Sequence, residues 1–363
     1  MLTTGEARLV AAEWVRAGAA SIPAFVGALL AGSARERAPD DPHPETSDLD
    51  VWIVVDAAVP DTVAEPEGRF AIRKLHHRGV LIERAFFPWE RLSEPARVLG
   101  DVYVAPTLVA PALLADPSGR LERVAAAVGA DFRRRSHVRR RVEGALALAG
   151  QFCDYAASGA TAPRFDPLVS RAAGLGVSVA HAAAALAAAA LLPPSNRWAF
   201  VRAGEVLRRH GRAELAEELL AALGSAGLGR AEVERAFAEL ERAYDAAVEV
   251  RRTPFGLDYN VAREARTPAL GGIRALVAVH PREAMDRLLF LRSLVQNVLE
   301  HDASAAVRAR FREGYVALLS AMGLDTDARR AARVAAIRAI VPRLRAACGE
   351  IIAATPGVVE DGG

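Results

Sequence analysis

The sequence predicts an α+β protein, with an N-terminal domain of strands and helices followed by an all-helical domain. Every convincing strand pattern lies in the first third of the chain. From residue 119 onward, alanine, leucine and arginine recur at helical spacing. The 363 residues are 52% hydrophobic, which is enough for two buried cores. We therefore expect domains at 1–125 and 126–356, with a disordered tail at 357–363.

The first expected elements are a helix and a buried strand. Residues 4–17 form an amphipathic pattern that Thr4 can cap and Gly18 can end. The apolar run 25–31 then predicts a buried strand that leads into Gly32.

The next segments predict a loop, more strands and a turn. Residues 35–47 are polar and contain three prolines, so they form a loop. The segment 76–79 predicts the turn of a hairpin, because Gly79 readily adopts positive φ. Further apolar runs, each bounded by turn-forming residues, predict strands at 49–55, 70–75, 80–87 and 113–115.

Composition and charge exclude several classes of protein. The net charge of +2 gives no argument for nucleic acid as a partner. The two cysteines, Cys153 and Cys348, have no metal-ligand spacing and indicate reduced thiols. The opening residues lack the apolar core of a signal peptide, and the apolar stretch 172–192 is typical of a buried helix. We expect a cytoplasmic protein with no membrane partner.

Two carboxylates mark the start of the strand at 49–55. Residues i and i+2 of a strand point to the same face, so Asp48 and Asp50 lie a few ångströms apart. Such carboxylates repel each other unless a cation lies between them. Mg²⁺ takes oxygen ligands and is commonly held by carboxylates together with substrate phosphates. The pair therefore predicts a magnesium site.

Gly32 and Ser33, which follow the preceding strand, supply a second feature. Glycine lets the backbone approach a phosphate closely, and the following N–H groups and hydroxyl can donate to it. A Gly-Ser pair after one strand and an Asp-x-Asp at the next resembles the DNA polymerase β-like nucleotidyltransferase superfamily. The likeness is greatest to the aminoglycoside nucleotidyltransferases, to which Pro88-Trp89 and the Asp-Pro-x-Gly of residues 116–119 are also similar.

The resemblance implies a nucleotidyltransferase fold, a mixed sheet with flanking helices, followed by a helical-bundle domain. It implies that Gly32, Ser33, Asp48 and Asp50 bind a nucleoside triphosphate, ATP by default, through Mg²⁺. In such enzymes, a hydroxyl of a small acceptor, such as an aminoglycoside-like compound, attacks the α-phosphate in line. The nucleoside monophosphate is transferred and pyrophosphate leaves.

Glu83 is the candidate third acid of the family pattern. The resemblance implies that it is either a third metal ligand or the general base that takes the acceptor proton. The structural alternative is a strand residue paired with Arg73 or Arg84 across the hairpin. Lys74 could reach a phosphate, although a solvated lysine at a strand edge is the preferred interpretation.

Two other functions are alternatives to a small-molecule nucleotidyltransferase. The first is a nucleotide-binding module without turnover, which the long loop at 34–47 favours and three acids argue against. The second is a toxin-like nucleotidyltransferase that modifies RNA or protein. Its one indication is the basic run FRRRSHVRRR at 132–141, and a solvated helix face is the default interpretation of that run.

Overall fold

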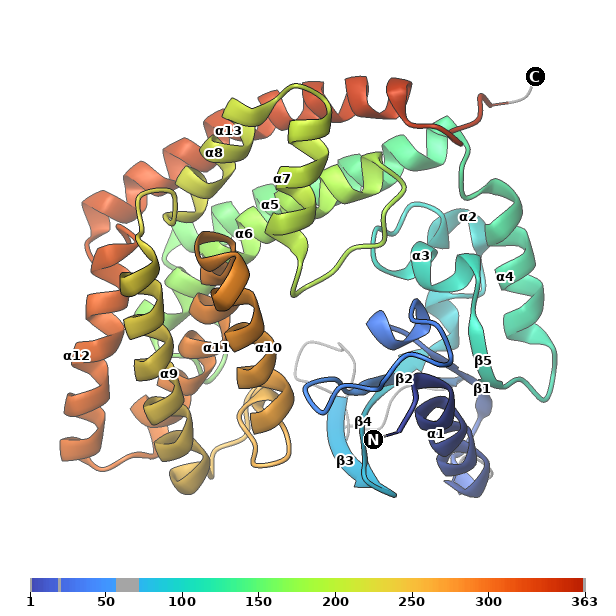
Figure 1. Cartoon of the computed structure of the whole chain (residues 1–363), viewed down its shortest axis with the longest axis horizontal. Coiled ribbons are helices and arrows are strands. Elements are labelled where there is room, and N and C mark those ends of the chain that lie inside the picture. The colour runs from blue at the N-terminus through green and yellow to red at the C-terminus, as the bar shows by residue number, and fades with distance from the viewer. Residues whose placement is uncertain (1, 19–20, 57–71, 362–363) are drawn as a thin grey trace. The chain divides into compact units, whose positions relative to one another are not determined.

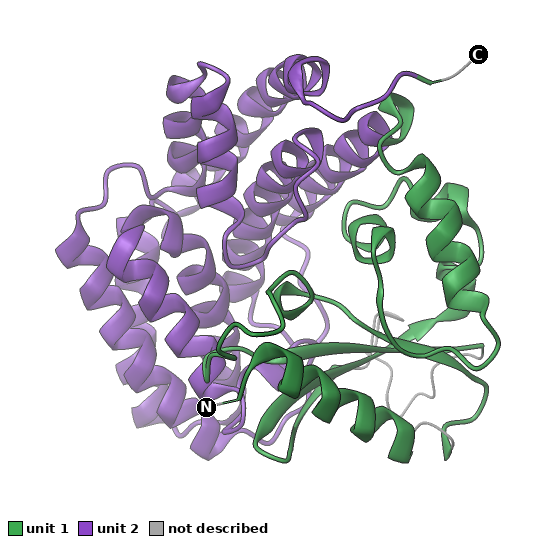
Figure 2. Ribbon diagram, turned by 45° about the vertical axis from the view of Figure 1, so that its right-hand side comes forward, with its two compact units in different colours: residues 1–137, 361–363 green, residues 138–360 purple. Residues whose placement is uncertain are grey.

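A computed structural model describes residues 2–18, 21–56 and 72–361. It confirms the predicted α+β class, with a five-stranded mixed sheet and a mostly helical chain (Figure 1). The chain divides into two compact units, residues 1–137 with 361–363 and residues 138–360 (Figure 2). The predicted boundary between residues 125 and 126 falls within α4 (Arg120–Asp131). In the expected tail, the carboxylate of Asp361 accepts hydrogen bonds from Ser136.

Unit 1 is built on the sheet, whose strand order is β3-β4-β2-β1-β5. The central neighbours β2 and β4 run parallel, and the other paired strands are antiparallel. This mixture places the start of β2 beside the first half of β4. The strands are β1 (Phe25–Leu30), β2 (Leu49–Val55), β3 (Ile72–His77), β4 (Val80–Pro88) and β5 (Ala112–Ala115).

The helix α1 (Thr4–Gly18) covers one face of the sheet. Its buried residues Ala7, Ala11 and Val15 share a core with the apolar side chains of β2 and β4. The N-cap differs from the expectation that Thr4 supplies it. Thr3 and Glu6 instead form a reciprocal pair, each side chain bonded to the other's backbone N–H.

Further helices of unit 1 pack beyond the other face. Leu121 of α4 contacts β1 at Gly27, where an added Cβ would lie 2.6 Å from the leucine side chain. The short helices α2 (Pro95–Val98) and α3 (Val104–Val109) pack against α4. The sheet is therefore flanked by helices, as amphipathic layers require.

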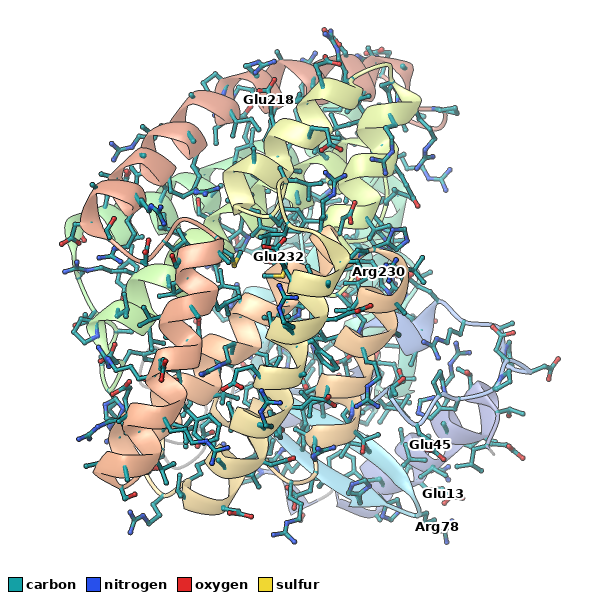
Figure 3. The ribbon with its side chains drawn as sticks, turned by 60° about the vertical axis from the view of Figure 1, so that its left-hand side comes forward. Glu13, Glu45, Arg78, Glu218, Arg230 and Glu232 are labelled. Carbon is teal, nitrogen blue, oxygen red and sulfur yellow. The ribbon has the colours of Figure 1, made fainter. Side chains whose placement is uncertain are left out.

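The β3–β4 hairpin is tighter than the sequence suggested. The expected strand 70–75 is observed as Ile72–His77, and residues 70 and 71 lie outside the described part. The turn consists of Arg78 and Gly79, both with positive φ. Arg78 forms an exposed ion pair with Glu13 of α1 (Figure 3). The shorter turn sets the register that the site depends on.

The regular elements of unit 2, within its described residues, are helices. By length and composition alone, α6 (Pro167–Ala189) is long and apolar enough to span a membrane, but 78% of its most apolar window is buried inside the protein. A core helix of a soluble protein has the same properties. From α5 onward the helices are α5 (Arg135–Ser158), α6 (Pro167–Ala189), α7 (Ala199–Arg209), α8 (Ala213–Leu223), α9 (Arg230–Val250), α10 (Arg266–Val279), α11 (Pro281–Asp302), α12 (Ala305–Ala321) and α13 (Asp327–Ala354).

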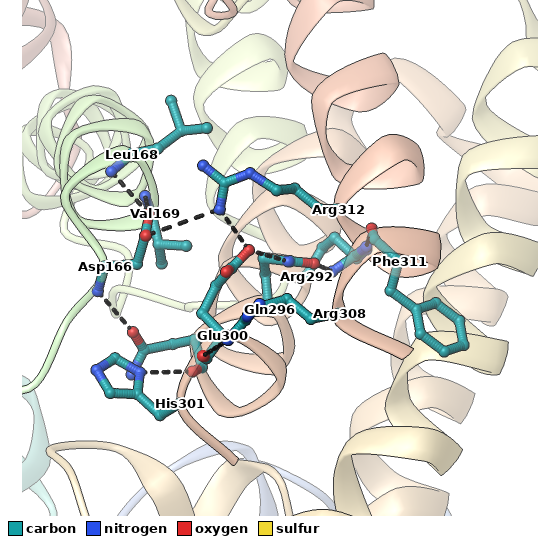
Figure 4. Close-up of polar contacts among 11 residues, drawn as sticks. Asp166, Leu168, Val169, Arg292, Gln296, Glu300, His301, Arg308, Phe311 and Arg312 are labelled. Carbon is teal, nitrogen blue, oxygen red and sulfur yellow. Dashed lines mark hydrogen bonds and ion pairs between the residues drawn. The ribbon is translucent and has the colours of Figure 1, made fainter. Parts of the chain in front are cut away.

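A buried polar network ties α11 to α12 (Figure 4). The guanidinium of Arg292 donates to the side-chain oxygen of Gln296 at 2.7 Å and to the carbonyl of Phe311 at 2.6 Å. Gln296 and Arg312 both donate to Glu300. Burial lowers the pKa of Arg292 to about 10, because it disfavours the charged guanidinium. The hydrogen bonds to Gln296 and Phe311 compensate for part of the hydration that the buried charge has lost.

Candidate functional site

The parallel pairing of β2 and β4 gathers the three predicted acids. Asp50 is aligned with Glu83 across the two strands, and Asp48 immediately precedes β2. Along β2 and β4, successive side chains point to opposite faces of the sheet. Leu49, Val51 and Ile82 pack in the core that α1 covers, so the acids lie on the opposite face. The carboxylates of Asp48, Asp50 and Glu83 therefore form one group, which we call the acid cluster.

Lys74 joins this cluster from β3. It is aligned with Glu83 in the β3–β4 hairpin, and its Nζ donates to Glu83 Oε2 at 2.5 Å and to Asp48 Oδ2. Its side chain is only 7% exposed, so the interpretation as a solvated edge lysine was wrong. The hairpin aligns Arg73 with Arg84, so neither arginine is the cross-strand partner of Glu83.

The acid cluster is short of positive charge. Burial raises the pKa of Asp50 well above its usual range, and Glu83 and Asp48 raise it further while Lys74 offsets part. Burial also raises the pKa of Glu83, against the effect of Lys74. A side-chain hydrogen bond joins Asp50 to Glu83 and raises the pKa of Asp50 while it lowers that of Glu83.

Lys74 itself remains charged. Burial alone would lower the pKa of its ammonium, but Glu83 and Asp48 outweigh burial and raise that pKa. Three carboxylates thus gather around one ammonium, which contacts Asp48 and Glu83. Such a group would gain from a further cation.

Gly32 allows Asp50 to adopt its position. The backbone of Gly32 has φ 64° and ψ −166°, a region open essentially to glycine alone. A Cβ at this residue would lie 1.8 Å from Asp50 Oδ2 and 2.8 Å from its Cγ. The backbone after β1 therefore lies directly against the acid cluster, and no side chain fits between them.

The short 3-10 helix η2 (Ser33–Arg35), which follows Gly32, is held by two arginines. Arg8 of α1 donates to the carbonyl oxygens of Ala34 and Arg37, both at 2.6 Å. Arg35 donates to the carbonyl of Pro106, also at 2.6 Å. Ser33 is consequently presented beside Gly32 on an anchored segment.

The rest of the long loop docks on the N-terminal segment through backbone hydrogen bonds. The amides of Thr4 and Gly5 donate to the carbonyls of Asp41 and Pro39, both at 2.8 Å. The loop buries His43, and this burial together with Arg37 lowers the pKa of its imidazole, against a raising effect of Asp48. His43 was not predicted as a buried residue, because neither its spacing from other residues nor its sequence neighbours distinguish it from a residue of a surface loop.

The donor set of the acid cluster suits Mg²⁺ in kind. It offers only carboxylate oxygens, which are ligands that Mg²⁺ commonly takes. Among residues 2–18, 21–56 and 72–361, however, no group of three acids, histidines or cysteines is already arranged as a metal cage. Asp48 and Glu83 instead converge on Lys74.

Comparison with known proteins adds no relative to this description. No protein-family model matches the chain. A search of curated proteins found no match.

We predict that Gly32→Ala is more damaging than Gly79→Ala. Both glycines have positive φ, but an added Cβ meets Asp50 at Gly32 and nothing within 4 Å at Gly79. Gly79→Ala should lower the free energy of unfolding by about 1–2 kcal/mol, the backbone contribution alone. Gly32→Ala should lower it by about 2–5 kcal/mol, because overpacking is added. Urea denaturation measures both, and equal losses would contradict the close approach.

We predict that Asp50→Asn stabilises the metal-free protein, and more so as the pH rises. The raised pKa of Asp50 means that its contribution is favourable at acid pH and is lost as the pH rises through that pKa. At pH 8 in EDTA, the variant should exceed the wild type by on the order of 1–3 kcal/mol, the range for relieving a poorly satisfied buried group.

The same series of denaturation curves at pH 5 to 8 supplies the control. Asp56, at the other end of β2, is exposed and forms an ion pair with Arg120 at 2.9 Å. Asp56→Asn should therefore show no stabilisation that grows with pH. An Asp50→Asn advantage that stays constant from pH 5 to 8 would show that the charge of Asp50 is not under strain.

Proposed function

We propose that the protein is a Mg²⁺-dependent nucleotidyltransferase that transfers a nucleoside monophosphate from ATP, or another nucleoside triphosphate, to a hydroxyl of a small acceptor. The observation that carries the proposal is the meeting of Asp48, Asp50 and Glu83 on one face of the sheet, against Gly32. Partly buried carboxylates destabilise a fold unless cations join them, and Lys74 supplies one ammonium for three acids. The remaining demand for positive charge supports a metal site over a purely structural role.

Each residue of the site has a role in this proposal. Asp48, Asp50 and Glu83 would hold Mg²⁺, which neutralises phosphate charge and keeps the triphosphate in line for attack. Gly32 brings the backbone against the acids that would hold the metal, and Ser33 would offer its amide and hydroxyl as donors to a phosphate. The anchoring of η2 by Arg8 and Arg35 keeps these donors in place before substrate binds.

The two units would then have different roles. Unit 1, with its mixed sheet, would be the nucleotidyltransferase domain, and the helical unit 2 would correspond to the helical-bundle domain that the motif resemblance implies. The acceptor class is a small molecule with a free hydroxyl, such as an aminoglycoside-like compound. The near-zero net charge gives no support to RNA as the default acceptor.

A second candidate is a nucleotide-binding module without turnover. One observation favours it: Lys74 already bridges Asp48 and Glu83, so part of the acid cluster is satisfied without a metal. The two candidates share the site and differ in whether a product forms. A transfer assay therefore separates them.

We predict transfer from α-labelled nucleoside triphosphates to a hydroxyl-bearing acceptor in the presence of Mg²⁺. The assay incubates the protein with each nucleotide and with small-molecule acceptors, RNA and protein substrates, and identifies products by mass spectrometry. Asp50→Asn should reduce transfer by about a hundredfold or more, because it removes charge from the position of the metal. Nucleotide binding without product from any acceptor would favour the binding module, and wild-type transfer by Asp50→Asn would remove Asp50 from the site.

We predict that Glu83→Gln separates metal binding from proton removal. A general base contributes to turnover but little to metal-dependent nucleotide affinity, whereas a metal ligand contributes to both. The measurement is Mg²⁺-dependent ATP affinity by calorimetry beside the rate of transfer. Loss of turnover with unchanged affinity identifies a base, and loss of both identifies a ligand. If neither changes, Glu83 is a structural residue of β4.

A further inference from the structure

Lys74 is the single lysine of the chain, and its ammonium lies between two of the three acids. The remaining basic side chains of the chain, out of 46 Lys and Arg, are all arginines. An ammonium is a compact charge with three rotatable donors, whereas a guanidinium is a wide, planar fork. The ammonium therefore fits between Asp48 and Glu83 much as a metal ion would.

The position of Lys74 explains why the acids form no metal cage in the described chain. Oδ2 of Asp48 and Oε2 of Glu83 are both occupied by its Nζ. A divalent cation that takes these oxygens as ligands must therefore compete with the ammonium. The outcome depends on charge, since the group has three carboxylates for one ammonium and two cations placed side by side would repel each other.

Lys74 lies on β3, one of the two edge strands of the sheet, and a lysine side chain has a flexible four-carbon stem. Its aligned partner Glu83 lies on β4, which neighbours both β2 and β3. A change in the conformation of the lysine side chain requires no change in strand pairing, so the acids would stay on their strands.

We propose that Lys74 is a built-in counter-ion that holds Asp48 and Glu83 together without metal and competes with the divalent cation for them. This inference rests on the proposed function. Binding of the metal with a nucleoside triphosphate moves the ammonium away from at least one carboxylate, and the phosphates offer it a new anionic partner. Metal alone therefore binds weakly and metal with nucleotide binds tightly, which couples the two ligands.

The test compares Mn²⁺ binding to the wild type, Lys74→Met and Arg73→Met in the absence of nucleotide, with free Mn²⁺ followed by electron paramagnetic resonance. Lys74→Met should bind Mn²⁺ about tenfold tighter or more, because a competing positive charge is gone. Arg73→Met should bind as the wild type does, because Arg73 is the exposed neighbour on the same strand. Binding to Lys74→Met that is no tighter than to the wild type would overturn the inference.

A measurement on the wild-type protein covers the case in which Lys74→Met fails to fold. Lysine labelled at its ε-carbon gives one side-chain resonance, because the chain has one lysine. This resonance should shift on titration with Mg²⁺ and a non-hydrolysable ATP analogue. A resonance that stays unchanged while calorimetry shows both ligands bound would mean that Lys74 keeps both carboxylates, and the competition would be disproved.

Failure of this inference is distinguishable from failure of the proposed function. Wild-type nucleotide transfer combined with unchanged metal affinity in Lys74→Met would overturn only the role of Lys74. Absence of Mn²⁺ binding in every variant, even with ATP, would overturn the metal site and with it both proposals.

Discussion

The pairing of β2 with β4 is the constraint on which the site depends. Two parallel strands in register bring Asp50 beside Glu83, and the sheet cannot separate them without breaking its central ladder. The backbone thus holds the carboxylates together against their mutual repulsion, so the stability of the site depends on the positive charge near them. Lys74 supplies part of that charge through its contacts with Asp48 and Glu83. The proposed magnesium site is the same requirement met by a stronger cation.

The anchored segment after β1 limits how far the acids can move. Asp50 lies so close to Gly32 that no Cβ could stand between them, and η2, which follows Gly32, is held by Arg8 and Arg35. The acids therefore cannot relieve their repulsion by moving toward the backbone that follows β1. Their cationic partner Lys74 comes from β3, an edge strand of the sheet. If the ammonium moves as we propose, a fixed backbone and a movable counter-ion would together suit a charged ligand.

Much of this unit follows from local sequence, because strand alternation and turn chemistry are local properties. The span of β2, the hairpin and the shared face of Asp48 and Asp50 were predicted from residues within a few positions of each other. Lys74 was missed for a reason of register. A four-residue turn was expected at 76–79, whereas the observed turn is Arg78 and Gly79, and only that turn aligns Lys74 with Glu83. The order of strands, with β4 beside β2, is a long-range choice that no local pattern contains.

The same group of partly buried acids could serve either candidate function. A nucleotide-binding module needs only a site in which a cation and phosphates are held, and Lys74 with Asp48 and Glu83 could satisfy part of that need. Transfer requires more, because charge must be neutralised at the reacting phosphate and an acceptor hydroxyl must lose its proton. The two candidates therefore make different demands on Asp50, which is aligned with Glu83 and whose pKa is raised by burial and by the neighbouring acids. Under the proposed function this third carboxylate would serve transfer, whereas a binding module would not require it.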